Sequence, residues 1–386
     1  MRPHEKEPSR GRLPFRWLGT RAALPSLVIG PQIVPVGILG YLANSWLLAA
    51  LPAVAGSASM FVALRGRRIE PRSRGHLYLG LWPFFAWWSA CLVLTAIAPL
   101  AVIAAALSGR PEIWLGGAAA VAAGFGVAAI VRSPRITRVR VAHPDLPPEL
   151  DGYQIAQLSD IHCGAFAPEQ RVRDWVRRTN ALGADLAVVT GDLIASGTDY
   201  VEAVASALGE LRAPDGVMAC MGNHDYFGTG EALFEALRDR GVRVLRNEHE
   251  LVRRGEDALV VAGVDDTWTR RDDLDRALDG RDEAAYTLLL SHDPDLFPAA
   301  AARGVHLTLS GHTHGGQLAV PLMARSLNLA KLAHAYTSGH YREGRSHLFV
   351  HRGAGTSGPP VRIGTRGEIA LITLVRDSDL PPARAR

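Results

Sequence analysis

The 386-residue chain has little cysteine, and the spacing of that cysteine excludes two common frameworks. Its three cysteines, Cys91, Cys163 and Cys220, are odd in number and far apart, and no pair has the Cys-x-x-Cys spacing. A network of disulfide bonds or a zinc site built from thiolates is therefore not expected. We interpret the three thiols as small packing groups in the protein interior.

Charged side chains are missing from long stretches of the first third of the chain. Residues 26–64, 77–107 and 113–131 contain no Asp, Glu, Lys or Arg. A membrane-spanning helix needs about 20 apolar residues, so the first run fits two helices with a turn near residues 44–45. The sequence predicts an all-α transmembrane region of about four helices over residues 26–131, after a basic tail over residues 1–25. The absence of ionisable residues in these runs favours a membrane anchor over a transporter.

The two parts of the chain differ in charge. The first 150 residues hold 16 of the 42 Lys and Arg residues but 6 of the 38 Asp and Glu residues, so the remainder is acidic. An acidic domain repels a phosphate backbone, and we expect no nucleic-acid partner. The basic residues gather in the tail, in residues 65–74 and in residues 132–140, whereas the opposite hairpin tips carry Arg110 and Glu112. With four spans all the basic segments lie on one side, which predicts a multi-pass protein of the cell membrane with a cytoplasmic soluble domain.

The soluble part repeats one pattern five times: a short apolar run that ends in polar residues. After a linker over residues 132–149, the runs are residues 153–158, 186–190, 217–221, 286–290 and 306–309. Helical patterns lie between several of them, as expected for alternating strands and helices of an α/β domain over residues 150–375. Ligands bind such sheets beyond the carboxyl ends of the strands, so the five polar clusters are expected to form one site. Residues 376–386 are expected to be a disordered tail.

The residue types in the five clusters predict a metal centre. The seven candidate ligands are Asp160, His162, Asp192, Asn223, His292, His312 and His314. Carboxylate, amide and imidazole groups suit Mn, Fe or Zn. Seven ligands are too many for one ion, whereas two divalent ions that share a carboxylate use them all. Such pairs, about 3.5–4 Å apart, are typical of phosphoryl transfer.

These motifs resemble those of the calcineurin-like metallophosphoesterases. The resemblance lies in Asp-x-His, Gly-Asp, Gly-Asn-His-Asp, a single His after a strand, and Gly-His-x-His. The apolar segments followed by YQIAQLSDIHCG, together with the closing HRGAGTSGPPVRIGTRGEI, look like the bacterial membrane-associated YkuE-like branch of that family. The resemblance implies an αββα four-layer sandwich. It also implies that Asp160, His162 and His314 hold one metal, that Asn223, His292 and His312 hold the other, and that Asp192 bridges the two. By the same resemblance, His224 contacts the phosphate and protonates the leaving group, and Asp225 orients His224.

Several other polar residues have two interpretations from the sequence. Arg352 and Arg362 are either a phosphate-binding fork or members of salt bridges. His340 and His351 contact substrate or have ordinary packing roles, and Asp265 with Asp266 either approaches the site or forms a turn. The substrate-binding residues are unknown at this stage.

The function predicted by these features is that of a metal-dependent phosphohydrolase in a membrane. The membrane anchor favours a membrane-associated or lipid-linked phosphoester or pyrophosphate as substrate. One alternative is a phosphodiesterase for soluble nucleotides, which the anchor merely localises. Another is a non-catalytic membrane sensor or scaffold that binds the metals.

Overall fold

The computed structural model describes residues 23–64, 71, 73–131, 133–228 and 230–377. The chain forms two compact units, which divide between Val131 and Arg132. Residues 1–22 and 378–386, which hold most of the two predicted tails, lie outside the described residues. Each unit is described by itself.

The described residues of the first unit are mainly helical. Asn44 adopts a left-handed conformation (φ 50°) at the predicted turn, and Ser45 caps the following helix by accepting a hydrogen bond from the N–H of Leu48. The elements are α1 (Ala23–Ile29), the 3-10 helix η2 (Gly30–Gln32), α2 (Ile33–Leu42), α3 (Trp46–Ala63), the π-helix η4 (His76–Leu81), α4 (Trp82–Ser108) and α5 (Pro111–Val131).

The number of long apolar helices differs from the predicted four. Among the described residues, three are long and apolar enough to cross a membrane: Trp46–Ala63, His76–Ser108 and Pro111–Ile130. The fourth apolar segment, Ser26–Leu42, is shorter, because the turn at Asn44 ends it and the 3-10 turn η2 interrupts it. The uncharged run contains two apolar segments, as predicted, and the first of them is one residue shorter than the second.

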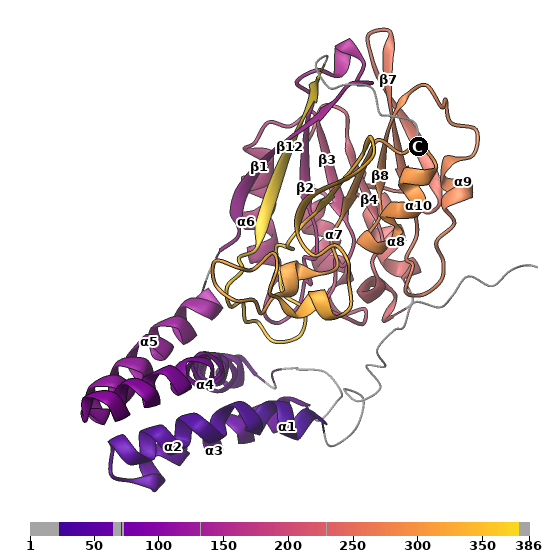
Figure 1. Ribbon diagram of the computed structural model, residues 1–386. Helices are drawn as coiled ribbons and strands as arrows, with labels where there is room; N and C mark the ends of the chain where they lie inside the picture. The colour runs from indigo at the N-terminus through magenta and orange to yellow at the C-terminus, as the bar shows by residue number, and fades with distance from the viewer. Residues whose placement is uncertain (1–22, 65–70, 72, 132, 229, 378–386) are drawn as a thin grey trace, which may run out of the picture. The chain divides into compact units, whose positions relative to one another are not determined.

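The second unit contains two six-stranded sheets (Figure 1). The first sheet has the order β1 (Arg135–His143), β12 (Glu368–Arg376), β2 (Gln154–Leu158), β3 (Leu186–Thr190), β4 (Val217–Cys220) and β5 (Arg243–Val244). The second has the order β10 (Gly339–Glu343), β11 (Ser346–Val350), β9 (Leu307–Ser310), β8 (Tyr286–Leu290), β7 (Asp257–Gly263) and β6 (Glu248–Arg254).

Helices cover the outer face of each sheet, which confirms the predicted αββα sandwich. Alternation along β3 shows the layering, since Leu186 and Val188 pack between the sheets whereas Ala187 and Val189 pack in the cluster of the outer helices. Successive side chains of a strand point to opposite faces, so a strand buried on both faces reads as a continuous apolar run. The outer helices are α6 (Glu169–Asn180), α7 (Val201–Leu208) and α8 (Glu231–Arg238) on the first sheet, and α9 (Leu274–Leu278) and α10 (Phe297–Ala302) on the second.

The segment predicted as a linker, residues 132–149, is largely part of the sandwich. Arg135–His143 forms β1, which pairs in parallel with β12 over nine residues, from Arg135 beside Glu368 to His143 beside Arg376. The sequence could not indicate that a strand begins as early as Arg135, because the partner strand lies more than 200 residues away along the chain.

The topology brings the polar clusters to one edge of the sandwich. In the first sheet β2, β3 and β4 are parallel, and in the second β7, β8, β9 and β11 are parallel. Their carboxyl ends therefore share an edge in each sheet, where ligands bind in open α/β folds.

The core between the sheets is expected to dominate the stability of this unit. Replacement of Leu288, which is fully buried there, by Ala should lower the free energy of unfolding by about 2–5 kcal/mol through lost burial and a residual cavity. The measurement is thiol labelling of Cys220, which is fully buried, over a urea series with the full chain in detergent micelles.

Leu251→Ala on β6 is the matched control. Leu251 is 42% exposed, so its truncation should change the free energy by no more than about 0.5 kcal/mol. Equal effects of the two substitutions on Cys220 labelling would contradict this assignment of the core.

Candidate metal centre

Two groups of potential metal ligands meet at the shared edge of the sheets. The first group is Asp160, His162, Asp192 and His314, and the second is Asp192, His292 and His312. Within each group the ligand atoms all lie within 4.8 Å of one another. Asp192 belongs to both groups, so its carboxylate lies where a bridging ligand between two ions would lie.

The distances show how closely the groups converge. The Asp192 Oδ2 atom lies 3.5 Å from His162 Nε2 and 3.3 Å from His292 Nε2. His162 Nε2 also lies 3.0 Å from His314 Nε2, and His292 Nε2 lies 3.2 Å from His312 Nδ1. Ring nitrogens that face each other this closely, beside a carboxylate, form a donor set of the kind that binds a divalent cation.

The protonation state of three of the four candidate imidazole ligands fits metal binding, whereas the Asp192 carboxylate raises the pKa of His292. Burial lowers the pKa of His162 to about 3 and that of His312 to about 4, and burial also lowers the pKa of His314. These rings are therefore neutral near pH 7, which is the form that binds metals. His292 donates from Nδ1 to the carbonyl oxygen of Thr190 at 2.8 Å, and this hydrogen bond directs Nε2 toward Asp192.

Asn223 supplies a further oxygen to this region. It begins the 3-10 helix η6 (Asn223–Tyr226) directly after β4, and its side chain is buried. Among the described residues, its Oδ1 atom has no hydrogen-bond partner. A buried carbonyl oxygen without a donor is costly, and a cation is one of the few groups that would satisfy it.

The backbone of five candidate ligands is left-handed. The φ angles of Asp160, His162, Asp192, His312 and His314 lie between 48° and 70°. Non-glycine residues seldom adopt this conformation, and when they do, the conformation often marks a functional site whose surroundings hold the strain. The sharp turns after the strands aim these side chains back across the ends of the sheets.

The role expected for Asp225 needs correction. Its carboxylate accepts hydrogen bonds from four backbone N–H groups, those of Asp192, Leu193, Ile194 and Gly222, at 2.8–3.2 Å. No hydrogen bond joins it to the His224 ring. Instead His224 Nδ1 donates to the carbonyl oxygen of Ala195 at 2.6 Å, and the backbone N–H of His224 donates to Asp192 Oδ1 at 2.9 Å. Asp225 therefore positions the Asp192 turn, whereas Ala195 orients His224.

Sequence reasoning also missed groups that have no side-chain signal. The backbone carbonyls of Thr190 and Ala195 orient His292 and His224, and any residue type could supply them. Two further rings pack against His312: Trp268 with a centroid separation of 5.6 Å and His334 with one of 5.0 Å.

The structure supports the salt-bridge interpretation for Arg352 and gives Arg362 a different role. Arg352 pairs with Glu368 at 2.9 Å, so the salt-bridge interpretation holds for it. Arg362 is buried and donates to the backbone carbonyls of His314, Arg352 and Gly355 at 2.6–3.0 Å. It supports the turn that carries His314, and its hydrogen-bonding capacity is largely used there.

The remaining open residues also have partners. His340 stacks on His347 with a centroid separation of 5.0 Å, and His351 accepts from the N–H of Gly353 at 2.9 Å. Asp265 approaches the site indirectly, because it accepts a hydrogen bond from Tyr226, two residues after His224.

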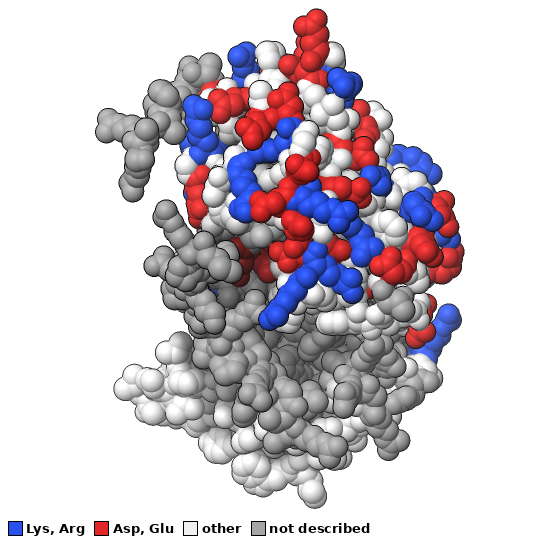
Figure 2. Space-filling view, turned by 90° about the vertical axis from the view of Figure 1, so that its right-hand side faces the viewer, with Lys and Arg blue, Asp and Glu red and all other residues white. Residues whose placement is uncertain are grey.

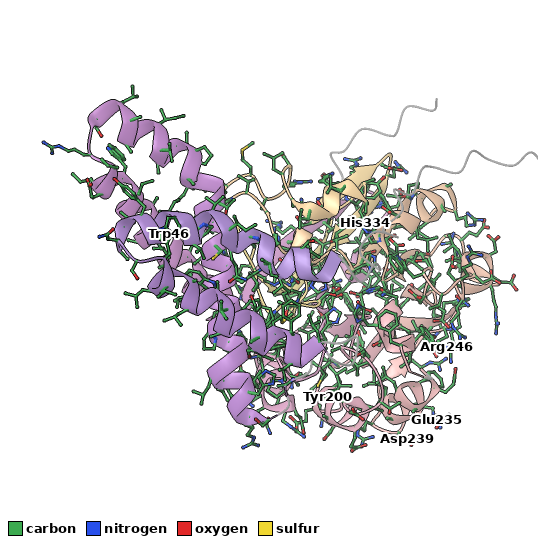
Figure 3. The ribbon with its side chains drawn as sticks, turned by 90° about the horizontal axis from the view of Figure 1, so that it is seen from below. Trp46, Tyr200, Glu235, Asp239, Arg246 and His334 are labelled. Carbon is green, nitrogen blue, oxygen red and sulfur yellow. The ribbon has the colours of Figure 1, made fainter. Side chains whose placement is uncertain are left out.

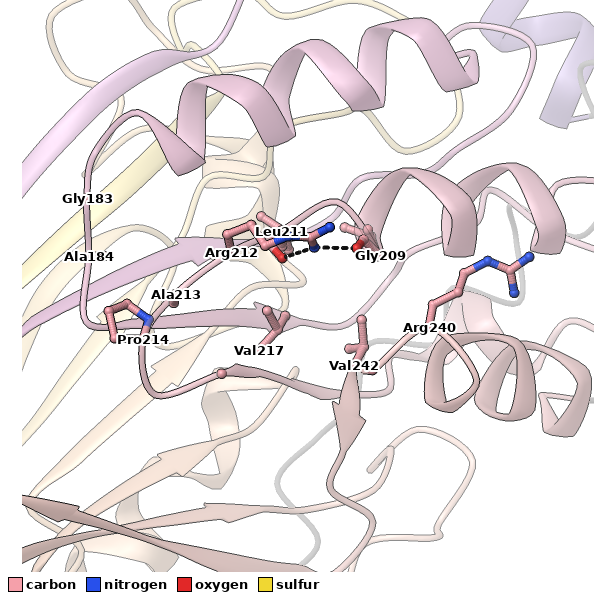
Figure 4. A pocket seen from close by; sticks show the side chains of 13 residues that line it. Gly183, Ala184, Gly209, Leu211, Arg212, Ala213, Pro214, Val217, Arg240 and Val242 are labelled. Atoms are coloured by element: carbon pink, nitrogen blue, oxygen red, sulfur yellow. Dashed lines mark hydrogen bonds between the residues drawn. The ribbon is translucent and has the colours of Figure 1, made fainter.

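Two other features lie at the opposite end of the sandwich. A groove of about 510 Å³ near the amino ends of β3 and β4 includes Arg212 and Arg240, and Arg212 is hydrogen-bonded to the carbonyls of Gly209 and Leu211 (Figure 4). At the carboxyl end of β1, His143 lies near Asp145 and His306, but Asp145 is paired with Arg345 at 2.8 Å. Neither feature matches the donor set at the shared edge.

Comparisons with known proteins identify the family of the chain. The model of the calcineurin-like phosphoesterase family matches residues 153–316. The chain is 34% identical over 269 residues to a transmembrane protein with metallophosphoesterase domain from Danio rerio, which covers 66% of this chain and 60% of that relative. It is 31% identical over 264 residues to the metallophosphoesterase YkuE of Bacillus subtilis, which covers 67% of this chain and 92% of YkuE.

A dimetal phosphatase from Danio rerio, known from its crystal structure, is 12% identical and aligns with a TM-score of 0.36 over 58% of this chain and 99% of that chain. The family assignment rests on the sequence relatives, of which YkuE is matched over nearly its whole length. On that basis, the chain belongs to the calcineurin-like metallophosphoesterase family.

Proposed function

We propose that the protein hydrolyses phosphate ester or anhydride bonds with two divalent cations, Mn, Fe or Zn, held by the seven predicted ligands. The observation that carries this proposal is the sharing of Asp192 by two ligand groups. Bound there, two cations would supply positive charge to the phosphoryl oxygens and activate a water molecule.

His224 is proposed as the acid that protonates the leaving group. Because its Nδ1 donates to a carbonyl oxygen, Nε2 is the ring atom that gains or releases a proton. Its ring packs edge-on against His162, with a centroid separation of 4.6 Å, which places it beside the first ligand group. The hydrogen bond from its backbone to Asp192 ties its position to that of the bridging carboxylate.

The substrate is proposed to be membrane-associated or lipid-linked, and the catalytic domain to be cytoplasmic. Three long apolar helices support membrane association. Residues 65–74 and 132–140 are rich in Arg, and an even number of spans, α4 and α5, separates them, so they lie on the same side whether or not Ser26–Leu42 also crosses. Short basic segments favour the cytoplasmic side.

Loss of the bridging carboxylate should remove metal. Asp192→Asn should reduce the bound divalent metal from about two ions per chain to one or fewer, because a neutral amide replaces the charge that two ions share. The measurement is metal content by mass spectrometry after Mn²⁺ loading of the full chain in detergent and desalting.

Asp145→Asn is the matched control for this prediction. It makes the same chemical change in the cluster at the opposite end, where Asp145 pairs with Arg345, and should leave the metal content unchanged. Retention of both ions in Asp192→Asn would contradict the bridging role.

Loss of the acid should slow turnover without removing metal. His224→Ala should lower kcat on an aryl phosphodiester by about 10²–10⁴-fold at unchanged metal content, because proton transfer to the leaving group is lost. Turnover that needs no divalent metal, or that survives both Asp192→Asn and His224→Ala, would contradict the mechanism. A fully loaded parent chain that turns over neither monoesters nor diesters would favour the sensor alternative.

The corrected role of Asp225 gives a third prediction. An Asn at this position keeps one acceptor oxygen but turns an N–H₂ group toward backbone donors, so Asp225→Asn should destabilise the domain by about 1–3 kcal/mol and reduce metal content. Denaturation followed by Cys220 labelling and metal analysis both test this. If Asp225 instead acted through His224, Asp225→Asn would keep both ions and full stability and would reproduce only the turnover defect of His224→Ala.

A further inference from the structure

Exposed apolar side chains of the second unit gather around the metal centre. In residues 133–228 and 230–377, ten large hydrophobic side chains are exposed, and two of them, Trp268 and Phe227, pack against His312 and His224. Six more lie in one segment, residues 318–332, which we name the apolar loop: Val320, Leu322, Met323, Leu327, Leu329 and Leu332. Eight of the ten are thus on the rim of the site or in the loop that follows the last ligand motif.

The apolar loop is an ordered structure fixed to the ligand-bearing turn. Its two ends are joined by a hydrogen bond from the N–H of Leu329 to the carbonyl of Leu318 at 3.1 Å, and Val320 donates to Leu327 at 2.9 Å. Beyond the loop, the hydroxyl of Thr313, which lies between His312 and His314, donates to the carbonyl of Thr337 at 2.7 Å. The loop is therefore held at a fixed position relative to the metal ligands.

Leu322 at the tip of the loop has two unfavourable features. Its exposed fraction is 105%, and its backbone is left-handed with φ 68°. A bulky apolar residue gains nothing from water contact and is strained in this conformation. An apolar medium around the tip would offset the cost of exposing this side chain.

The charges around the loop indicate which kind of apolar surface the tip would contact. No Asp or Glu occurs between Asp295 and Glu343, although the chain after residue 150 is acidic as a whole. The loop itself carries Arg325 and Lys331. By contrast, charges of both signs intermingle on the face of the second unit that Figure 2 shows. Arg243 and Arg246 pair with acidic residues of this unit. Apolar side chains with scattered cations and no acids fit an anionic lipid surface.

Chain connectivity supplies an independent argument. The register of β1 with β12 and of β12 with β2 places Arg135 at the sheet edge where β2 ends, directly before the ligand Asp160. Arg135 follows the last residue of α5 by four positions, which span at most about 14 Å. The site-bearing edge is therefore the edge that is tethered to a helix long enough to cross a membrane.

We propose that the apolar loop, with Trp268 and Phe227, is a lipid-binding surface that enters the headgroup layer of the membrane and brings a lipid-borne phosphate to the metal centre. The part that concerns the substrate rests on the proposed hydrolase function, whereas the lipid contact itself does not. The ligand class is an amphiphile with an anionic phosphate group and apolar chains.

The lipid contact is testable without activity. The three native cysteines are buried, so a cysteine introduced as Leu322→Cys or Leu332→Cys is open to selective labelling with an environment-sensitive fluorophore. Asp239→Cys is the control, because Asp239 is exposed at the end of α8, in a different part of the domain from His334, which follows the loop (Figure 3). The full chain is reconstituted in phosphatidylcholine–phosphatidylglycerol vesicles that contain a nitroxide-labelled lipid.

The expected result is strong quenching of the probes at positions 322 and 332 by the labelled lipid and little quenching at position 239. Quenching of the loop probes by aqueous iodide to the same extent as at position 239 would overturn the proposal, because the loop would then face water. Protection of the loop probes from both quenchers would also overturn it, because protein, from this chain or another, would then cover the loop.

The proposal that the loop brings a lipid-borne phosphate to the site is tested by a separate activity measurement. In the double variant Leu322→Ser with Leu332→Ser, the kcat/KM for a phospholipid ester should fall about 10-fold relative to that for a soluble aryl phosphodiester, since two apolar contacts with the lipid are lost. Leu251→Ser on β6 should leave the ratio unchanged. An equal fall on both substrates would overturn the substrate part. If the parent chain turned over neither ester, the hydrolase function would fail while the quenching experiment still decided the lipid contact.

Discussion

The buried carboxylate of Asp225 is the constraint on which the metal centre depends. It accepts N–H groups from the turn after β3 and from the turn after β4, and so joins the two turns that carry Asp192 and Asn223. The turns also approach closely, since a Cβ atom on Gly222 would lie 2.4 Å from Asp192 Oδ1. The glycine at position 222 and the fully buried Asp225 together hold the backbone of Asp192 in its left-handed conformation.

The site also depends on the packing of the two sheets. Asp160, Asp192 and Asn223 follow strands of the first sheet, whereas His292, His312 and His314 follow strands of the second. A hydrogen bond crosses between the sheets from His292 to Thr190, and a second one joins Gln157 in β2 to the carbonyl of Ser310 in β9 at 3.1 Å. Any shift of one sheet on the other would move His292, His312 and His314 away from Asp192, so the geometry of the candidate ligand set depends on core packing.

The sequence predicted those features of the fold and the site that depend on local residue patterns and on the periodicity of apolar residues. Apolar runs such as residues 186–190 indicated strands buried on both faces, and the polar residues after them indicated one site. It could not show that Asp225 binds four backbone N–H groups rather than His224, because that contact depends on how two turns meet in space. For the same reason the sequence could not predict that the carbonyls of Thr190 and Ala195 orient two histidines. It also could not predict that β1 pairs with a strand more than 200 residues away.

Because β1 begins at Arg135, the segment that connects the second unit to α5 is short. A flexible linker of 18 residues would let the domain move over roughly 20–25 Å from its anchor. Instead residues 132–134 are the chain between α5 and β1, and β1 is fixed to β12 along its whole length. A short connection at the site-bearing edge restricts which surfaces of the domain can reach lipid. The apolar loop follows the last ligand motif, so its exposed side chains and the position of the tether are two separate observations that support the proposed lipid-binding surface.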